Sequence, residues 1–508
     1  MTSDSDSTEA TVGNYVEGPF GAPVPEREVE VTLLHDELNL FDATAVAVSS
    51  VAPAYSLAST LGFIFVIAGI TYAGPAMMWL CFVPVLFIAV AYFHLNRRQP
   101  SAGASYAWLS ATVHPYVGWY NGWIQVTTSV LFCVAAPFLA GAYTLQFFNS
   151  VGWISTAAAN NVWYTAFAAS LYLVFVTFIC IYGIRWTTNV QWVLVLIEYI
   201  AVLVFSVGGI IKVLVSHPAG STHFNIGWFS PGNIHGYTAL AAGAALAVFF
   251  FWGWDTAVNL SEESKSQNKI PGQAAVISMF LLLFVFILNF VAVEMLVPAS
   301  QINAQGVNVL FYFGEVFAGS WAKYVMIFAV ITSTVATTQT TLLPAARISY
   351  AMSRDKVFPR LFGTVHRRFQ TPAIGTLVLA IIALAGLYGI VAFRGSSNVG
   401  DVLGYIITDI GVLVAIYYGA TGLACAWAFR KAAFEKTSFL FMGIILPALS
   451  GLFMFWIGYE VIRQNWSMHM APTVIFLGLG VPLAIVARIR NTSGFFSTKP
   501  VAYETIDA

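Results

Sequence analysis

The sequence predicts an all-helical integral membrane protein with twelve membrane-spanning helices. Of its 508 residues, 58% are apolar or aromatic and only 9% are Asp, Glu, Lys or Arg, whereas about 25% of an ordinary soluble domain is charged. One crossing of a bilayer needs about 20 largely apolar residues, and the chain contains twelve runs of that kind. This composition excludes a soluble globular protein.

The twelve spans follow from apolar runs that Gly, Pro, Asn or charged residues separate. Runs this long and this poor in charge are typical of helices that cross a bilayer. In order, the predicted spans are Ala43–Ile67, Pro75–Leu95, Val117–Leu145, Val162–Gly183, Val190–Val215, Tyr237–Ser261, Gln273–Val297, Ala322–Tyr350, Pro372–Phe393, Val402–Trp427, Phe439–Val461 and Ala471–Ile489. An even number of spans places both termini on one side of the membrane.

The positions of Lys and Arg indicate which side that is, because short cytoplasmic loops carry an excess of positive charge. With cytoplasmic termini, eighteen of the 22 basic residues fall inside. The four left outside are Lys212, Lys323, Arg394 and Arg463. We therefore expect a multi-pass protein of the cell membrane with both termini in the cytoplasm.

Several other classes of function lack support in the sequence. A formal net charge of -1 offers no basic face to a nucleic acid. The eight His and four Cys show neither HExxH nor CxxC spacing, and neither a Ser/His/Asp constellation nor a Gly-rich phosphate loop stands out. We expect no metal, no cofactor and no enzymatic activity.

Two spans carry residues that interrupt a helix near mid-membrane depth. In the first span these residues are Ser49, Ser50, Val51, Ala52 and Pro53. Pro53 lacks an N–H and clashes with the carbonyl four residues earlier. In the sixth span they are Trp252, Gly253, Trp254 and Asp255. A packing kink would explain either break alone, but irregular backbone at this depth must line a cavity or be buried, and two breaks five spans apart indicate the binding site of a transporter with inverted repeats.

Three stretches resemble signatures of one transporter family. Residues 346–359, ARISYAMSRDKVFP, resemble its Arg-x-x-Tyr-Ala-Met-x-Arg-Asp-x-x-x-Pro motif. Residues 253–255, GWD, followed by EESK and IP, resemble its sixth-helix pattern, and residues 100–106, PSAGASY, resemble a loop after its second helix. Over about residues 40–490 the chain thus resembles the amino acid, polyamine and organocation (APC) transporter superfamily.

This resemblance implies a LeuT-type fold, with a five-plus-five inverted repeat, broken helices 1 and 6, and two additional C-terminal helices. It divides the chain into an acidic, disordered N-terminal tail (1–39), two repeats (40–216 and 217–430), the last two helices (431–490) and a C-terminal tail (491–508). One departure concerns the substrate. The first span lacks the Gly-Ser-Gly turn with which many members bind an amino-acid carboxylate.

Three of the acids inside predicted spans are candidate site residues, because an ionisable group there is costly unless it is paired or functional. Asp255, beside the second break, is expected to pair with a substrate ammonium or to carry a proton. Glu198 is expected either to exchange the coupling proton, because burial disfavours its charged form, or to form a neutral hydrogen bond between helices. Asp409 is a third candidate proton carrier with no role implied by the family.

The remaining candidates are polar or aromatic. Gln125 and Thr128 lie one helical turn apart and are expected to face the cavity. The resemblance implies that Phe249 falls where members of the family place an aromatic lid. Trp252 and Trp254 can contribute cation–π contacts or simply pack in the core. Thr332, Ser333 and Thr334 offer oxygens suited to a sodium ion, although hydroxyls of this kind also bond back to their own helix.

The sequence is therefore interpreted as a secondary active transporter that imports or exchanges an amino acid or a related amine or polyamine by alternating access. Proton coupling is favoured over sodium coupling, because the spans contain several acids but no clear set of oxygen ligands for a sodium ion. The alternatives are a sodium-coupled permease for another small organic solute, a channel, which would show a continuous polar pore, and a membrane-embedded enzyme. The sequence leaves the oligomeric state open.

Overall fold

The computed structural model describes residues 15–17, 23–25, 33, 35–67, 70, 72–182, 184–305, 308–394, 399–466 and 470–506. Most of the predicted disordered tail, residues 1–39, lies outside the described residues. Within that tail, β1 (Tyr15–Glu17) pairs antiparallel with β2 (Pro23–Pro25).

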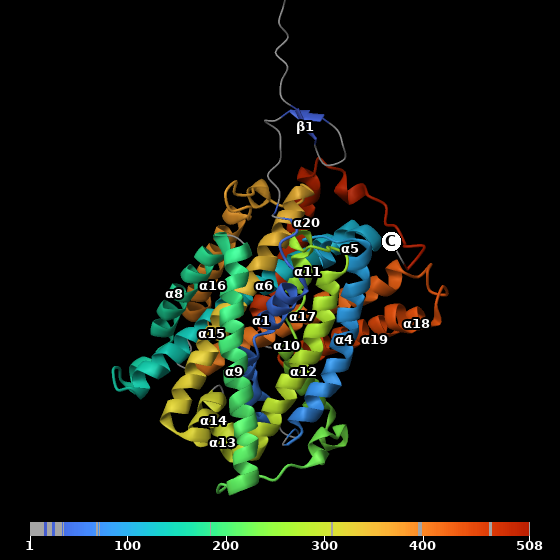
Figure 1. Cartoon of the computed structure of the whole chain (residues 1–508). Coiled ribbons are helices and arrows are strands. Elements are labelled where there is room, and N and C mark those ends of the chain that lie inside the picture. Colours follow the sequence, from blue (N-terminus) through green and yellow to red (C-terminus); the bar gives the residue numbers. More distant parts are fainter. Residues whose placement is uncertain are drawn as a thin grey trace, which may run out of the picture.

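The described chain is otherwise a bundle of helices (Figure 1). Eleven of its helical segments are long and apolar enough to cross a membrane. The long uninterrupted helices are α4 (Gly74–Arg98), α6 (Pro115–Ser150), α8 (Val162–Ile181), α9 (Ile184–Ser216), α12 (Ile270–Leu296), α15 (Ser320–Arg354), α16 (Ala373–Arg394), α17 (Val399–Ala428), α19 (Leu446–Gln464) and α20 (Ala471–Arg490). Each falls on a predicted span: most begin or end a few residues beyond it, α8 ends two residues before it does, and α19 begins after the π-helical turn that occupies its predicted start. The prediction of an all-helical membrane protein is confirmed.

The first predicted span consists of four successive pieces. They are α1 (Leu40–Val51), α2 (Pro53–Ser56), the π-helical turn η2 (Leu57–Leu61) and α3 (Gly62–Val66). Between α1 and α2, Ala52 adopts the left-handed conformation, with φ 50° and ψ 78°. Pro53 can begin α2 because the first residue of a helix needs no hydrogen-bonded N–H.

The sixth predicted span contains α10 (Tyr237–Phe250), a turn over residues 251–255, and α11 (Thr256–Asn259). Gly253 in that turn has φ +119°, a conformation that favours glycine. A Cβ atom there would lie 2.9 Å from the backbone carbon and oxygen of Ser50. The turn of the sixth span therefore packs directly against the last residues of α1.

Short elements connect the long helices. They are α5 (Ser105–Thr112), α7 (Thr156–Ala159), η3 (Ile226–Phe229), η4 (Pro231–Asn233), η5 (Ser261–Glu263), α13 (Ala299–Gln305), α14 (Val309–Ala318), η7 (Arg360–Gly363), α18 (Thr437–Phe439), the π-helical η8 (Leu440–Ile445) and η10 (Phe495–Ser497).

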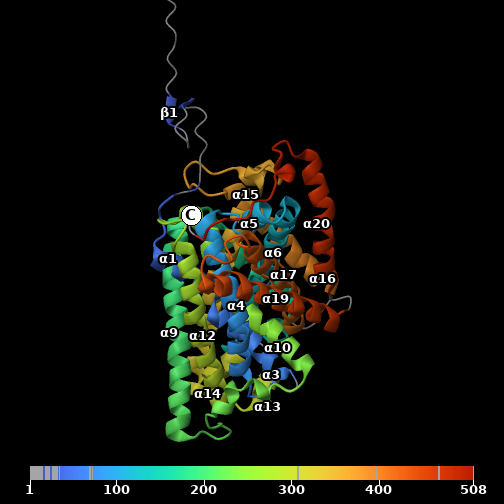
Figure 2. The same cartoon turned by 90° about the vertical axis from the view of Figure 1, so that its right-hand side faces the viewer.

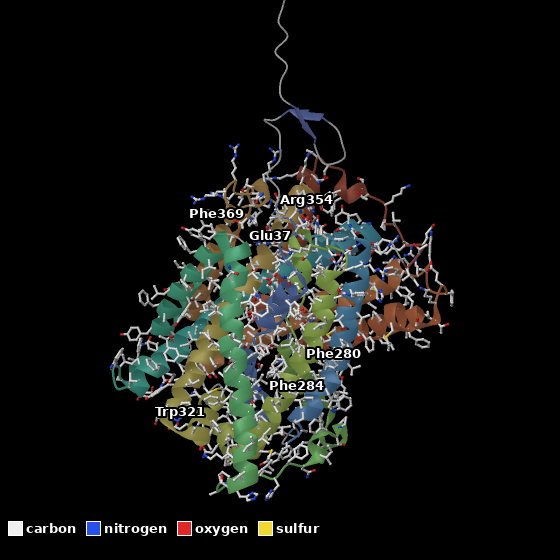
Figure 3. All side chains as sticks on the ribbon, viewed as in Figure 1. Glu37, Phe280, Phe284, Trp321, Arg354 and Phe369 are labelled. Atoms are coloured by element: carbon white, nitrogen blue, oxygen red, sulfur yellow. The ribbon has the colours of Figure 1, made fainter. Side chains whose placement is uncertain are left out.

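One end of the bundle carries the start of α1, the ends of α4 and α15, and the C-terminus. We call this end the terminal face. It is uppermost in Figures 1 and 2, and α13 and α14 lie at the opposite end. Figure 3 shows Arg354 near the terminal face and Phe280 and Phe284 on the outer side of α12, where they are 54% and 62% exposed. Large exposed apolar side chains between the two ends are expected of a surface that contacts lipid.

Candidate binding site between the two broken helices

A cavity of about 20 Å³ lies where the two broken helices meet. Its lining comes from the end of α1, α6, the 251–255 turn, α11, α15 and α17. The predicted residues that line it are Ser50, Gln125, Trp252, Gly253 and Asp255. This volume holds about one water molecule, so the described conformation is closed around the cavity.

Two tyrosines of α17 hold the carboxyl group of Asp255. Tyr417 Oη donates to Oδ2 at 3.0 Å and Tyr418 Oη donates to Oδ1 at 3.1 Å. Trp252 Nε1 in turn donates to Tyr417 Oη at 2.5 Å. Asp255 is 6% exposed, and its oriented oxygens form one side of the cavity.

Two further acceptors line the cavity without a hydrogen-bond donor among the described residues. Gln125 Oε1 and Asn259 Oδ1 are both buried and both lack a partner. The amide of Gln125 is oriented by its Nε2, which donates to Asn121 at 2.6 Å, and Asn259 Nδ2 donates to the Asp255 carbonyl at 3.1 Å. Buried unsatisfied acceptors cost about 1–3 kcal/mol each, so this arrangement is suited to a ligand that supplies N–H donors.

The polar groups of the first break are shared among neighbouring helices. Ser50 Oγ lies 2.9 Å from Thr256 Oγ1 of α11, and the Ser50 carbonyl accepts from Thr337 of α15 at 2.6 Å. Ser49 Oγ instead donates to Gln191 of α9, away from the cavity. The Val51 carbonyl accepts from Ser56 Oγ at 2.7 Å.

Glu198 of α9 lies on the other side of the same break. Its Oε1 accepts from the Ala54 N–H and from Ser333 Oγ, each at 2.8 Å, and the Tyr55 N–H donates to Ser333 Oγ at 3.0 Å. Glu198 is completely buried, and its Oε2 has no partner in the described part of the chain. We call Glu198, Ser333 and the Ala54 N–H the α9–α15 cluster.

A layer of aromatic rings separates the cavity from a larger one toward the opposite face. Phe132 packs edge-on against Tyr55 and Trp252, with ring centroids 5.2 Å and 4.9 Å apart, and lies 6.3 Å from Phe249. Phe249 lines the larger cavity, which has a volume of about 340 Å³ and lies between α3, α10 and α17. Phe249 therefore lies between Phe132 and the larger cavity, and its role as a lid stays a prediction.

Ion pairs join η5 to α15 on the terminal-face side of the site. The Arg347 guanidinium binds both carboxylate oxygens of Glu263, at 2.9 and 3.2 Å, and both side chains are buried. Arg354 makes a second two-bond pair with Glu262, at 3.1 Å for each bond, but is 45% exposed. Two residues of the predicted signature, Arg347 and Arg354, thus hold the end of the sixth span against α15.

Several predicted site residues lie elsewhere. Trp254 is buried between Tyr92 and Tyr418, with centroids 4.9 and 5.3 Å away, and Thr128 bonds to its own helix at Ile124. Thr332 and Thr334 bond back to α15, so Ser333 alone of that hydroxyl run joins the α9–α15 cluster. Asp409 accepts from Thr473 of α20 at 2.6 Å and does not line the cavity.

Sequence reasoning missed four residues that the structure makes prominent. Tyr417, Tyr418 and Asn259 surround Asp255. Glu294, near the end of α12, is buried and accepts from the Gly74 N–H at 3.2 Å. The one available signal was an ionisable or polar side chain inside an apolar helix, and Glu294 carried it as plainly as Glu198 did.

A multi-pass helical bundle with a small polar cavity between two interrupted helices defines a membrane transport protein. The chain belongs to the amino acid permease family, whose model matches residues 38–487. Members of this family are transporters, so the chain is a permease and not an enzyme.

Curated relatives are similar at low identity over most of the chain. The low-affinity putrescine importer PlaP of Escherichia coli K12 is 25% identical over 378 residues, which cover 73% of this chain and 80% of the relative. The methylthioribose transporter of Bacillus subtilis is 26% identical, covering 69% and 76%. The branched-chain amino acid permease BcaP of Lactococcus lactis is 23% identical, covering 78% and 84%. These relatives are all transporters, but the substrates in their names differ in charge.

Proposed function

We propose that the protein takes up an organic amine, carried as an ammonium ion, across the cell membrane by proton-coupled alternating access. The observation that carries this proposal is the set of three acceptors around the cavity. The Asp255 carboxylate, Gln125 Oε1 and Asn259 Oδ1 all present oxygen to one small space. An ammonium group supplies N–H donors to such oxygens, and Trp252 adds an aromatic face for the cation.

The first break favours an amine over an α-amino acid. An amino-acid carboxylate would need N–H groups that the break releases. The Ala52 N–H donates to the Val48 carbonyl at 3.2 Å, the Ala54 N–H to Glu198, and the Tyr55 N–H to Ser333. Pro53 has no N–H. In addition, no Lys or Arg is among the described residues that line the cavity. These features support a substrate without an α-carboxylate, such as a diamine.

Glu198 is the proposed carrier of the coupling proton. Its carboxyl contacts the backbone of the broken helix directly, so a change in its protonation alters the hydrogen bonds that fix α2. Sodium coupling has less support, because the Thr332 and Thr334 hydroxyls face their own helix. The proton would therefore act on the element that has to move when the site opens.

We further propose that the terminal face is cytoplasmic, as the excess of Lys and Arg indicates. The larger cavity beyond Phe249 then opens outward. Uptake would require the aromatic layer to open first and the Arg347–Glu263 pair to separate later.

The test is uptake of labelled putrescine, cadaverine, arginine and leucine into proteoliposomes, with and without an inward proton gradient. We expect saturable, gradient-driven accumulation of the diamines and its loss in Asp255→Asn. Asp409→Asn is the matched control, because Asp409 is also a buried acid but binds Thr473 of α20. It should transport like the parent.

Two results would overturn parts of the proposal. If leucine accumulates and the diamines do not, the substrate class is wrong, although the protein remains a permease. If Asp255→Asn takes up diamines with the parent's KM, Asp255 does not bind the ammonium group.

A further inference from the structure

A basic pocket lies at the terminal face, away from the cavity between the broken helices. It has a volume of about 580 Å³ and is formed by the end of α4, the end of α17 and residues 500–505 of the C-terminal tail. The tail is fixed there by backbone bonds from Val501 to Ala111 and from Tyr503 to Ala428, each 2.8 Å. Three cations line the pocket, namely Arg98, Arg430 and Lys431.

Among the described residues that line the pocket, Glu504 is the one acid. Glu504 pairs with Lys431 at 3.0 Å, with the two side chains 77% and 56% exposed. An exposed pair of this kind contributes about 0–1 kcal/mol, so another anion can replace Glu504. Arg98 lies over the ring of Tyr503, 5.0 Å from its centroid. Arg430 and Lys431 therefore offer positive charge next to a readily displaced carboxylate.

An apolar groove of about 540 Å³ lies beside this pocket on the outer surface of the bundle. Leu109, Val113, Val117, Leu423, Trp427 and Phe455 form most of its wall. Val117, Trp427 and Phe455 are 42%, 52% and 36% exposed, and α6, α17 and α19 are all candidate membrane spans. The groove thus faces the hydrocarbon region at the half of the bundle nearest the terminal face.

Trp427 and Arg430 connect the two features. Trp427 lines the groove and Arg430 lines the pocket. The Arg430 guanidinium stacks over the Trp427 ring, 4.1 Å from its centroid, and its Nη1 donates to the Trp427 carbonyl at 2.5 Å. Tryptophan prefers the interface between headgroups and hydrocarbon, so this contact marks the level at which a lipid changes from headgroup to acyl chain.

We propose that this combined site binds an anionic phospholipid, with its phosphate at Arg430 and Lys431 and an acyl chain in the groove lined by Trp427. Basic pockets beside membrane helices are suited to anionic headgroups. A soluble phosphate would use the pocket alone and would leave the groove unfilled. The juxtaposition of charge and apolar groove is what selects a lipid.

The test is native mass spectrometry of the full-length protein in a neutral detergent, titrated with phosphatidylglycerol, with phosphatidylcholine of the same chains, or with glycerol phosphate. We expect phosphatidylglycerol to bind at least tenfold more tightly than either of the others. Arg430→Gln/Lys431→Gln should weaken it about tenfold. Arg367→Gln/Arg368→Gln removes the same charge from exposed residues outside the pocket and should bind like the parent.

A second variant tests the groove without altering any charge. Ala420 lines the groove, so Ala420→Phe should weaken phosphatidylglycerol binding several-fold. This variant decides the matter if the double substitution does not fold. The proposal is overturned if glycerol phosphate binds as tightly as phosphatidylglycerol, if the Arg367/Arg368 variant loses as much affinity as the Arg430/Lys431 variant, or if Ala420→Phe binds like the parent.

Discussion

Asp255 and Glu198 are both buried carboxyl groups, but their neighbours differ in kind. The oxygens of Asp255 accept from two tyrosine side chains on α17 and face the cavity. One oxygen of Glu198 accepts from a backbone N–H at the break and from Ser333, and the other has no partner among the described residues. Asp255 is placed to meet a substrate, whereas Glu198 is placed to influence the backbone of the first span.

At the residue scale, Glu198→Gln should separate transport from coupling. A glutamine Oε1 can still accept from Ala54 and Ser333, so the fold is retained, but the amide cannot exchange a proton. We expect accumulation driven by a proton gradient to fall at least tenfold while exchange of internal for external substrate persists. The control is Glu315→Gln, an exposed acid that pairs with Lys323. Gradient-driven accumulation at the parent's level would rule out Glu198 as the proton carrier.

At the scale of the elements, the backbones of the two breaks are in direct contact, so the conformation of one constrains the other. The carbonyl of Ser50, near the end of α1, lies 2.9 Å from where a Cβ of residue 253 would be. The first break is also held by side chains from α9 and α15. A change in one break must therefore disturb the other.

Gly253→Ala should abolish transport. The substitution adds a Cβ at a backbone with φ +119° and presses it against the backbone of Ser50. Strain of this type costs about 1–3 kcal/mol before any clash. We expect a lower apparent unfolding temperature in detergent and no substrate binding. Gly389→Ala is the control, because no atom lies within 4 Å of its added Cβ; equal behaviour of the two variants would contradict the close packing of the breaks.

The two ion pairs between η5 and α15 should differ in their effect on closure. Removing one partner of the buried Arg347–Glu263 pair should cost about 3–5 kcal/mol, whereas the Arg354–Glu262 pair, with side chains 45% and 16% exposed, should contribute less. Ile348 lines the cavity, so the variant Ile348→Cys places a thiol there. In that variant, adding Glu263→Gln should raise the rate of thiol labelling from the terminal face several-fold. Glu262→Gln should change it much less. All four native cysteines are buried, so they give little background. Equal rates in the two variants would show that Arg347–Glu263 does not close the site.

At the scale of the whole molecule, the terminal face gathers the ends of many helices and the C-terminal tail. Phe495 stacks on Tyr106 at 5.9 Å, and Ser493 Oγ donates to the Asp355 carbonyl at 2.8 Å. Tyr106 Oη also donates to the Asp355 carboxyl at 2.6 Å. The tail therefore packs against the end of α15, next to the segment that carries Arg347 and Arg354.

The proposed orientation can be checked with fusions to the full-length chain. A C-terminal green fluorescent protein should fluoresce and a C-terminal alkaline phosphatase should be inactive, because both termini are expected in the cytoplasm. A phosphatase inserted after Ser221, in the loop between α9 and α10, should be active. The opposite pattern would place the terminal face outside and reverse the direction of transport.

The sequence by itself determined the class of fold and the positions of the breaks. Apolar runs separated by loops locate membrane helices because no partner is needed to satisfy a helix backbone in lipid. A proline and a glycine reveal interruptions by their own backbone chemistry, and the predicted ranges for the long helices differ from the observed ones by a few residues. Asp255 was predictable because a carboxylate beside such a break stands out.

Only the tertiary structure decided which polar groups meet. Tyr417 and Tyr418 lie 162 and 163 residues from Asp255 in the sequence, and each span is so apolar that its buried and lipid-facing sides look alike. The same uncertainty made Trp254 a candidate for the cavity wall and Asp409 a candidate proton carrier; in the structure Trp254 packs between Tyr92 and Tyr418, and Asp409 binds Thr473 of α20. In lipid, helices pack through shape and scattered hydrogen bonds rather than through a hydrophobic stripe. The periodicity of a single helix therefore does not predict which of its faces packs against which neighbouring helix.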